Sequence, residues 1–415
     1  MSQDDVIEGK RSPAVITSWA LYDFANTIFS MVVVSRYFPL WVTEDMGAQD
    51  IYISIPTSIS MLMVALTVPV FGALTDQTGR RVRPLFFITA GCVIATASMG
   101  AADSLYTGLA LFAIANYCYQ AALVFYDGLL PTVARGASLG RVAGFGVALG
   151  YLGAVIGLAM VTPIANAYGR QAAFVPVALL FMLFALPCFL LVKDDHARPA
   201  QPLGQPIRHA FSQLAATFRA ARERRNLFIF LLANLFILDC VNTVISFMSV
   251  YAKKVMGLDG TPLTIFQTVA ILMAVAGAFI WGQLTHRIGA HKTMQILCGM
   301  WLITLMVAAS AMNPVMYWAV GTLAGLSMGG VWVAGRTLLA QLAPPERVGE
   351  FFGLFNLAGK AAAIMGPMIW GVTVAIFTPL GGTIQHRMAI LSLAVNVIIG
   401  WYLLRMVDPE KKEAA

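Results

Sequence analysis

The sequence has few charged residues and no long polar segment. Only 11% of its 415 residues are charged, whereas a soluble domain carries about 25%. Hydrophobic residues make up 59% of the chain, and the mean hydropathy is +0.77. This shortage of charge excludes a soluble enzyme or a soluble binding domain. The composition describes an all-α integral membrane protein that crosses the bilayer many times.

Patterns of reactive and metal-binding residues are also missing. The five cysteines are spread singly over apolar segments, so we expect neither a disulfide framework nor a CxxC site. No HExxH motif and no GxxxxGK[ST] phosphate loop occurs in the sequence. We therefore expect no enzyme activity, no metal, no cofactor and no ATP-driven transport.

The basic residues do not indicate a nucleic-acid partner. The net charge is +7, but the lysines and arginines lie in short loops between apolar segments, where they fix the orientation of a membrane protein. The first 13 residues are too polar and acidic for a cleavable signal peptide. We expect the first apolar stretch to direct the chain to the membrane and to be retained.

Twelve apolar stretches approach the roughly 20 residues that a helix needs to cross the hydrocarbon core. They cover about residues 14–41, 52–74, 84–102, 105–133, 142–166, 172–192, 227–252, 263–285, 292–312, 314–342, 350–376 and 386–406. The predicted organisation is a tail at 1–13, a six-helix half at 14–192, a linker at 193–226, a second six-helix half at 227–406 and a tail at 407–415.

Lysine and arginine are unevenly divided between the two sides. An even number of spans puts both termini on one side, whose loops hold twenty of these residues against four in the opposite loops. The positive-inside rule then places both termini in the cytoplasm. In the linker, Ile207, Phe211, Leu214 and Phe218 recur at helical spacing beside arginines. This pattern predicts a basic amphipathic helix on the inner leaflet, with a solvated connector as the alternative.

The sequence contains an internal repeat. "GALTDQTGRRVRP", from Gly72, aligns with "GQLTHRIGAHKTM", from Gly282, at an offset of 210 residues. "LGRVAGFGVALGYLGAVIG" aligns with "VGEFFGLFNLAGKAAAIMG" at an offset of 209, with four glycines in register. The two offsets agree over half the chain, so we predict two homologous, pseudo-symmetric halves.

These features resemble the major facilitator superfamily, in which two parallel six-helix halves surround a central site. "GALTDQTGRRVR" resembles the superfamily's loop signature between helices two and three. The resemblance implies that Asp76 caps or pairs with a neighbouring helix end, and that Arg80, Arg81 and Arg83 anchor the loop at the inner leaflet. In the second copy, His286 stands where an acid is expected.

A narrower resemblance covers nearly the whole chain. "WALYDFANTIF", "LVFYDGLLP", "GYLG", "LDCVNTVIS" and "EFFGLFNLAGKAAAIMGP" resemble the vacuolar amino-acid effluxer family of autophagy and its bacterial relatives. The resemblance implies transport of amino acids across a plasma membrane or vacuolar membrane, without fixing the direction. We expect the inner membrane of a bacterium. In the family, stretch seven reads Asn-Asp-Gly where this chain has Leu238-Asp239-Cys240, so only the acid carries over.

Five ionisable residues lie well inside the apolar stretches: Asp23, Asp127, Asp239, Arg336 and Lys360. Each charge costs about 2.5–3.5 kcal/mol near the bilayer centre. Five isolated charges would cost roughly 12–18 kcal/mol, comparable with the stability of a whole protein, about 5–15 kcal/mol. The charges must therefore be paired, hydrated or neutralised, and lipid-facing positions are excluded.

Polar residues accompany these charges at helical spacing. Stretches one, four, seven, ten and eleven carry, in order, Trp19, Asp23, Asn26 and Ser30; Asn116, Gln120 and Asp127; Asp239, Asn242, Ser246 and Ser249; Trp332 and Arg336; and Asn356 and Lys360. In the superfamily fold, stretches one, four, seven and ten line the central cavity. The distribution predicts a water-filled path.

The charge pattern suggests how a small solute would bind. We expect Lys360 to bind an anionic substrate group, and Asp239, with nearby amides, to bind its polar or cationic end. The full predicted substrate-binding set is Asn26, Gln120, Asp239, Asn242, Trp332, Asn356 and Lys360. Asp23 or Asp239 is expected to carry a coupled proton, in preference to a sodium ion. The alternative is a permanent structural salt bridge.

A second group of residues is predicted to act in gating. Asp127 and Arg336 are 209 residues apart and occupy equivalent positions in the two halves, so they could pair across the cytoplasmic mouth. The predicted gating set is Asp76, Arg80, Arg81, Asp127, Arg336 and Glu350. Glu350 begins stretch eleven, where capping of the helix N-terminus is its more direct role.

Three functions compete for this sequence. The leading one is a secondary active transporter of a small polar solute, with the lipid bilayer, the solute and a coupling ion as partners and a monomeric state. A proton-coupled exporter of hydrophobic or toxic compounds is the second, and its path would be more aromatic with fewer ions. A membrane sensor or scaffold is the third, although no extramembrane domain is found.

Overall fold

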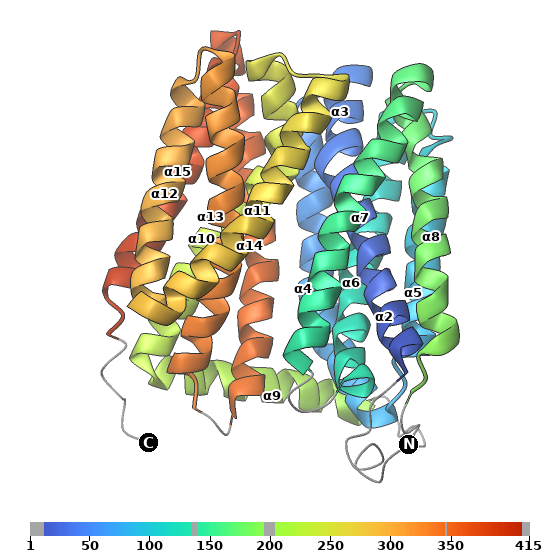
Figure 1. Cartoon of the computed structure of the whole chain (residues 1–415), viewed down its shortest axis with the longest axis vertical. Coiled ribbons are helices and arrows are strands. Elements are labelled where there is room, and N and C mark those ends of the chain that lie inside the picture. The colour runs from blue at the N-terminus through green and yellow to red at the C-terminus, as the bar shows by residue number, and fades with distance from the viewer. Residues whose placement is uncertain (1–11, 135–138, 195–203, 345–346, 409–415) are drawn as a thin grey trace. The chain divides into compact units, whose positions relative to one another are not determined.

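The computed structural model describes residues 12–134, 139–194, 204–344 and 347–408. In these ranges the chain is helical and contains no β-strand (Figure 1). Its contacts divide the chain into two compact units. Unit 1 comprises Met1–Trp41 and Leu66–Phe211, and unit 2 comprises Val42–Ala65 and Ser212–Ala415.

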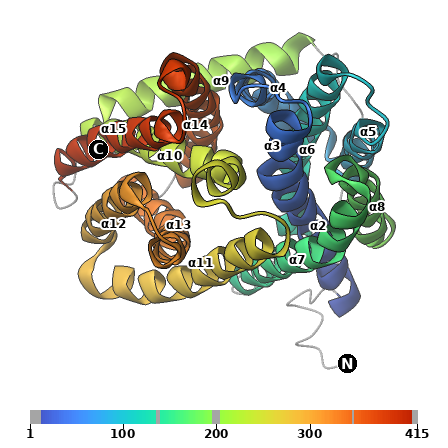
Figure 2. The same cartoon turned by 90° about the horizontal axis from the view of Figure 1, so that it is seen from above.

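The helices of unit 1 are long and mostly apolar. They are α2 (Pro13–Ile28), the π-helical η1 (Phe29–Tyr37), α3 (Phe38–Leu40), the second part of α4 (Ile51–Thr78), α5 (Val82–Met99), α6 (Leu105–Val133), α7 (Leu139–Tyr168), η4 (Arg170–Ala173) and α8 (Phe174–Leu191). α2 lies against α7 and α8, and α5 lies against α6 and α8 (Figure 2). The core of unit 1 therefore forms around α2.

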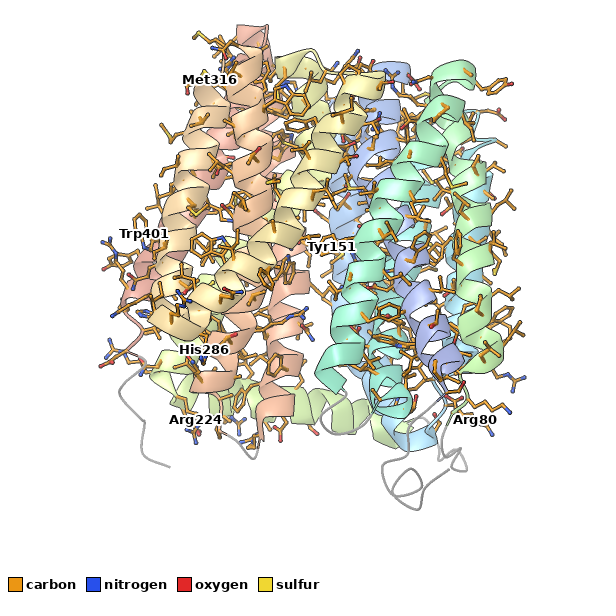
Figure 3. All side chains as sticks on the ribbon, in the orientation of Figure 1. Arg80, Tyr151, Arg224, His286, Met316 and Trp401 are labelled. Carbon is orange, nitrogen blue, oxygen red and sulfur yellow. The ribbon has the colours of Figure 1, made fainter. Side chains whose placement is uncertain are left out.

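Unit 2 is also built mainly from long helices. It contains η2 (Trp41–Asp45, from Val42), the first part of α4, part of α9 (Gly204–Glu223), α10 (Arg225–Met256), α11 (Gly260–Ile288), α12 (Ala290–Ser310), α13 (Pro314–Leu342), α14 (Val348–Phe377), η6 (Thr378–Leu380) and α15 (Ile384–Arg405). α10 lies against α14 and α15, and α11 lies against α13. Figure 3 marks the two ends of unit 2 by His286 and Met316.

The predicted membrane spans agree with the helices. Eleven helices in the described ranges are long and apolar enough to cross a membrane. The remaining predicted stretch, 14–41, coincides with the continuous helical run from Pro13 to Asp45, in which α-helical and π-helical segments alternate. An architecture of twelve spans is consistent with both observations.

The helix bounds carry the internal repeat. Those of α6 and α13 differ by 209 residues at both ends, and those of α7 and α14 also differ by 209 at both ends. The turn after α4 uses Gly79 with φ of +67°, and the turn after α11 uses Gly289 with φ of +89°. Glycine adopts this left-handed region without steric cost. The two aligned sequence motifs thus end their helices in the same way.

Glycines on α7 bring it close to α2. A Cβ on Gly153 would overlap the carbonyl oxygen of Phe24, and one on Gly157 would lie 2.9 Å from the Ile28 side chain. Small residues at helix contacts allow backbones to approach in a membrane protein. By contrast, Gly144 and Gly353 have no described atom within 4 Å of where a Cβ would stand, so their alignment has no packing explanation.

The contact units differ from the predicted halves in one segment. Residues Val42–Ala65, which include the first part of α4, make their contacts within unit 2, although they precede most of unit 1 in the chain. α4 is therefore shared between the units, and the division at residues 193–226 stays a prediction. Of the predicted tails and linker, residues 1–11, 195–203 and 409–415 lie outside the described residues.

Candidate functional site

Asp239 is the most deeply buried of the predicted charges. It lies in the middle of α10 and is 0% exposed. The Asn396 side chain, on α15, donates a hydrogen bond to Asp239 Oδ2 at 2.5 Å. On the other side, α14 approaches through Gly366, where a Cβ would overlap Thr243 Oγ1 and come close to Asp239 Oδ1. Three helices thus enclose one carboxylate, which an amide orients.

Asn242 links α10 to the segment of α14 that carries Lys360. Its amide nitrogen donates to the Gly359 carbonyl oxygen at 3.3 Å, and Lys360 is the next residue along α14. Further along the same face of α10, Ser249 Oγ accepts a hydrogen bond from Gln267 at 2.9 Å. The predicted polar stripe of α10 therefore serves partly to hold neighbouring helices in place.

The remaining predicted substrate residues of unit 2 are more accessible. Lys360 is half-buried on α14, and Asn356, one turn earlier, is exposed. On α13, Arg336 is exposed and its guanidinium carbon lies 6.0 Å from the ring centre of the half-buried Trp332. That distance is at the outer limit of a cation–π contact. Unit 2 therefore combines a buried carboxylate with cations that are at least partly accessible.

Unit 1 brings two carboxyl groups near each other. Asp23 on α2 is half-buried, and Asp127 on α6 repels it electrostatically. A Cβ on Gly150 of α7 would lie 2.9 Å from Asp23 Oδ2, so a larger residue there would displace this carboxylate. Like charges in a low dielectric are costly. This arrangement can accommodate a proton or another positive group.

An aromatic wall lies beside these carboxyl groups. Tyr126 stacks on Trp19 with ring centres 4.8 Å apart, and on Tyr22 at 4.9 Å. The Trp19 indole donates to the Tyr126 carbonyl oxygen at 3.4 Å. The Tyr126 hydroxyl is buried and lies close enough to Asp23 and Asp127 to interact with them electrostatically. It has no hydrogen-bond partner among the described residues. It is a polar group available to the site.

The other predicted residues of unit 1 lie on the same two helices. Asn26 is 4% exposed on α2, one turn beyond Asp23, and its Oδ1 has no hydrogen-bond partner within the described ranges. Gln120 is half-buried on α6. Both amides are therefore placed along the helices that carry the two carboxyl groups, as their spacing predicted.

The predicted gating residues fall into separate places. Glu350, in the first turn of α14, forms an ion pair with Arg347 at 2.7 Å and accepts a hydrogen bond from Thr217 of α9 at 3.1 Å. The hydrogen bond with Glu350 raises the pKa of Arg347 above its usual value. Glu350 thus joins the second part of α9 to α14.

The loop before α5 is held by a residue that the sequence did not single out. Asp194, which follows α8, accepts hydrogen bonds from the backbone nitrogens of Arg81 and Val82 at 2.8 and 3.1 Å. The Arg81 side chain lies against α6 at Gly128, 3.0 Å from where a Cβ would stand. The Asp76 side chain lies outside the described residues.

The two residues of the predicted gate pair belong to different units. Asp127 belongs to unit 1 and Arg336 to unit 2. Both are exposed near the ends of α6 and α13 at which those helices finish. Their pairing stays a prediction. Within the described ranges, no group of three histidine, cysteine, aspartate or glutamate side chains is placed to hold a metal ion.

Asn234 is a buried amide that the sequence analysis missed. It lies on α10, is 0% exposed, and neither side-chain polar atom has a hydrogen-bond partner in the described part of the chain. Its Oδ1 is 3.4 Å from where a Cβ on Gly335 of α13 would stand. A single amide in an apolar stretch gives no periodic signal, so only its burial reveals it.

We expect Asn234→Leu to separate stability from transport. An unsatisfied buried amide costs about 1–3 kcal/mol, so its replacement by leucine should raise the midpoint of thermal unfolding. If the amide serves the transport path, the same variant should transport solute several-fold more slowly. Thermal unfolding in detergent and uptake into vesicles measure the two effects. A less stable variant with unchanged transport would contradict the expectation.

Comparison with known proteins identifies the family. Residues 48–415 match the family model described as "Vacuole effluxer Atg22 like". The uncharacterized MFS-type transporter YxiO of Bacillus subtilis is 28% identical over 422 aligned residues, which cover 97% of this chain and 96% of YxiO. Autophagy-related protein 22-1 of Penicillium rubens is 26% identical over 305 residues, which cover 66% of this chain and half of the fungal protein.

Solved structures show the same fold. The nucleoside transporter NupG superimposes with a TM-score of 0.77 at 11% identity, covering 95% of this chain and 99% of NupG. A bacterial homologue of the human lysosomal transporter Spinster gives a TM-score of 0.73 at 13% identity, covering 96% and 98%. These likenesses show the major facilitator fold. The chain is therefore a multi-pass membrane transporter, not an enzyme, and it belongs to the Atg22-like vacuole effluxer family of the major facilitator superfamily.

Proposed function

We propose that the protein is a secondary active transporter that moves an amino acid or a related small carboxylate by alternating access, coupled to protons. The observation that carries this proposal is the environment of Asp239. The carboxylate is fully buried within a membrane-spanning helix and accepts a 2.5 Å hydrogen bond from Asn396. Ionisable groups inside membrane spans are costly and mark substrate paths or proton relays.

In this proposal the substrate binds between opposite charges. Lys360 attracts the substrate carboxylate, and Asp239 attracts its ammonium group. Asn242 holds the Lys360 segment through the Gly359 carbonyl. The amides and rings of Asn26, Gln120, Trp332 and Asn356 provide further polar and aromatic contacts. A zwitterionic amino acid satisfies both charges at once.

Protons are the proposed coupling ion. Asp23 and Asp239 are the proposed carriers, because each can lose its charge by binding a proton when its partner leaves. In unit 1, a proton on Asp23 relieves its repulsion by Asp127. A sodium site needs several oxygen ligands around one point, whereas a proton needs only one carboxylate. The pairing of charges supports the proton.

The proposed setting is the plasma membrane, with both termini in the cytoplasm, and the protein acts as a monomer. The excess of arginine and lysine in the loops on the side of the termini supports this orientation. α9, whose Thr217 and Ala221 are buried within unit 2, is proposed to lie along the inner leaflet. Its arginines would then face the anionic headgroups.

Uptake into proteoliposomes tests the proposal. The probe is an equimolar mixture of radiolabelled amino acids, offered with and without a pH gradient and in exchange against the same unlabelled mixture. We expect exchange without a gradient and net uptake that a protonophore abolishes. Failure to move or exchange any amino acid or small carboxylate would overturn the substrate proposal. Uptake that ignores the protonophore would overturn the coupling.

Lys360→Gln should weaken substrate binding with little change in fold. A hydrogen bond to a charged group contributes about 1.5–3 kcal/mol, so we expect the KM for the transported amino acid to rise by roughly 10–100-fold. Lys253→Gln is the matched control, because Lys253 pairs with Asp259 at the end of α10. An equal effect of both substitutions on KM would show that Lys360 has no particular role.

A further inference from the structure

Three buried polar side chains meet at the Met316 end of unit 2. Asp50 precedes α4, Trp370 lies on α14, and His386 lies in the first turn of α15. They are 3%, 1% and 2% exposed. The Trp370 indole donates to Asp50 Oδ2 at 2.7 Å, and His386 Nε2 lies 3.5 Å from the same oxygen. The ring nitrogens of Trp370 and His386 therefore both lie close to the same carboxylate oxygen of Asp50.

This cluster fastens the first part of α4 within unit 2. The first part of α4 and α14 meet along a seam. On this seam, Ser58 Oγ donates to the Ile364 carbonyl oxygen of α14 at 2.8 Å. A Cβ on Gly371 of α14 would overlap Ser54 Oγ. Glu44, just before α4, forms an ion pair with Lys254 of α10 at 2.5 Å. The second part of α4 belongs to unit 1, so these contacts hold a helix that both units share.

The cluster contains a side chain that can bind a proton. Histidine is the side chain that ordinarily titrates between about pH 5 and pH 8. Neither nitrogen of the His386 ring has a hydrogen-bond partner among the described residues. When the ring binds a proton, its charge faces the buried Asp50 carboxylate. A buried carboxylate that is left with one neutral donor is much less well compensated than one that faces a cation.

The surroundings of His386 contain few other charges. Its neighbour on α15, Arg387, directs its guanidinium to the Ala309 and Ala311 carbonyl oxygens at the end of α12. From α10, the Tyr251 hydroxyl donates to the Ala308 carbonyl oxygen. α14 contributes the ring of Trp370, and η6 has no ionisable side chain. Asp50 is thus the acid that His386 faces, while Arg387 is held by carbonyl groups.

We propose that Asp50 and His386 form a proton-binding latch that holds the first part of α4 against α14. The proposal rests on the alternating access of the proposed function, since the latch must open when α4 leaves α14. A proton that binds more tightly to the latched form than to the open form stabilises the latched form. Acid at this end of the protein therefore keeps the latch closed, and neutral to alkaline pH releases it.

Thiol labelling of Ser58→Cys tests the latch without any substrate. Ser58 is 7% exposed on the latched seam, so a water-soluble maleimide reaches it only when α4 separates from α14. The variant is made in a chain whose five native cysteines are replaced by alanine. Its rate is divided by that of Met312→Cys, because Met312 is 83% exposed just before α13 begins at the same end. This division cancels the effect of pH on thiol reactivity. We expect this ratio to rise about tenfold from about pH 5.5 to about pH 8.

Three further substitutions, each added to the Ser58→Cys variant, distinguish a proton-binding latch from a cluster with only a structural role. His386→Gln should make the ratio independent of pH. Trp370→Phe, which leaves a smaller aromatic ring and removes the donor to Asp50, should raise the ratio at every pH and keep its pH dependence. Lys254→Gln breaks the neighbouring ion pair with Glu44 and leaves His386 in place, so it should also keep the pH dependence.

Two results would overturn the latch. One is a ratio that does not change with pH in the parent, and the other is a pH dependence that survives in His386→Gln. Labelling is measured without substrate, so these results are independent of amino-acid uptake. A latch that behaves as expected in a protein that moves no amino acid would overturn only the proposed substrate.

Discussion

Asp239→Asn is expected to lower amino-acid uptake by about 10–100-fold while the protein remains folded. An interaction with a charged group contributes about 1.5–3 kcal/mol, and each 1.4 kcal/mol changes an equilibrium tenfold. Asparagine has nearly the same shape as aspartate and can still accept the hydrogen bond from Asn396. The substitution removes only the negative charge and the proton that the carboxyl group can carry. Initial uptake rates into proteoliposomes measure the effect.

The control for this prediction is another carboxylate of unit 2. Asp259 lies at the start of α11, where it caps the helix and pairs with Lys253. Asp259→Asn should lose at most a little stability, because an exposed ion pair contributes less than about 1 kcal/mol, and should keep its transport rate. Exchange is also measured, since both net uptake and exchange should fail in Asp239→Asn. An Asp239→Asn protein that transports at the parent rate would remove Asp239 from the mechanism.

Gly329→Ala should have the largest effect on stability. Gly325 and Gly329, one turn apart on α13, contact the backbone of α11, and a Cβ at Gly329 would overlap the Ala274 carbonyl oxygen. Gly277 on α11 meets the Leu326 carbonyl oxygen in the same manner. A rigid backbone cannot yield as a side chain does, so the two helices must separate. We expect a loss of about 1–3 kcal/mol and a fall of several degrees in the unfolding midpoint.

Gly299→Ala is the matched control for the glycine prediction. Gly299 lies on α12 in the same unit, and no described atom lies within 4 Å of where its Cβ would stand. Alanine is favoured over glycine in a helix by about 1 kcal/mol, so this variant should be as stable as the parent or slightly more stable. Thermal unfolding in the same detergent compares the two. Equal midpoints for Gly329→Ala and the parent would contradict the close packing of α11 on α13.

The features that the sequence predicted best are those that follow from periodic or repeated patterns. Apolar stretches located the spans, because every helix that crosses a bilayer must be apolar over about 20 residues. The offset of 209 residues between glycine motifs also appears in the bounds of α6 and α13. Charges in apolar stretches marked Asp239 for attention, and the structure buries it. In each case the signal can be read from a pattern in the sequence.

The features that the sequence missed depend on contacts between distant segments. Asn396 and Asn234 are single amides in apolar stretches, so nothing nearby marks the bond of Asn396 to Asp239 or the burial of Asn234. Asp50 and His386 lie at helix ends and read as loop residues, although the fold buries both. The π-helical segment Phe29–Tyr37 has no signal in apolar periodicity. The four-residue spacing of Gly325 and Gly329 is typical of helices in close contact. It was not used in the sequence analysis to predict the packing of α13 on α11.

The central claim is that the charges within the membrane spans face a water-filled path. Its most direct test compares the labelling of single cysteines by a water-soluble maleimide in proteoliposomes, from both sides and with and without amino acids. The five test positions are Asp23, Asp127, Asp239, Arg336 and Lys360. Two lipid-facing controls are Leu179 and Phe279, which are 67% and 68% exposed, whereas Asp239 is 0% exposed.

For Asp239, the account predicts the reverse of what exposure alone would give. Cysteines at the five charged positions should react in at least one state, whereas those at Leu179 and Phe279 should stay unlabelled because the lipid tails cover them. If the two control positions react and all five charged positions resist the reagent in every state, the charges are sealed inside protein. A carrier that moves a solute past them is then excluded.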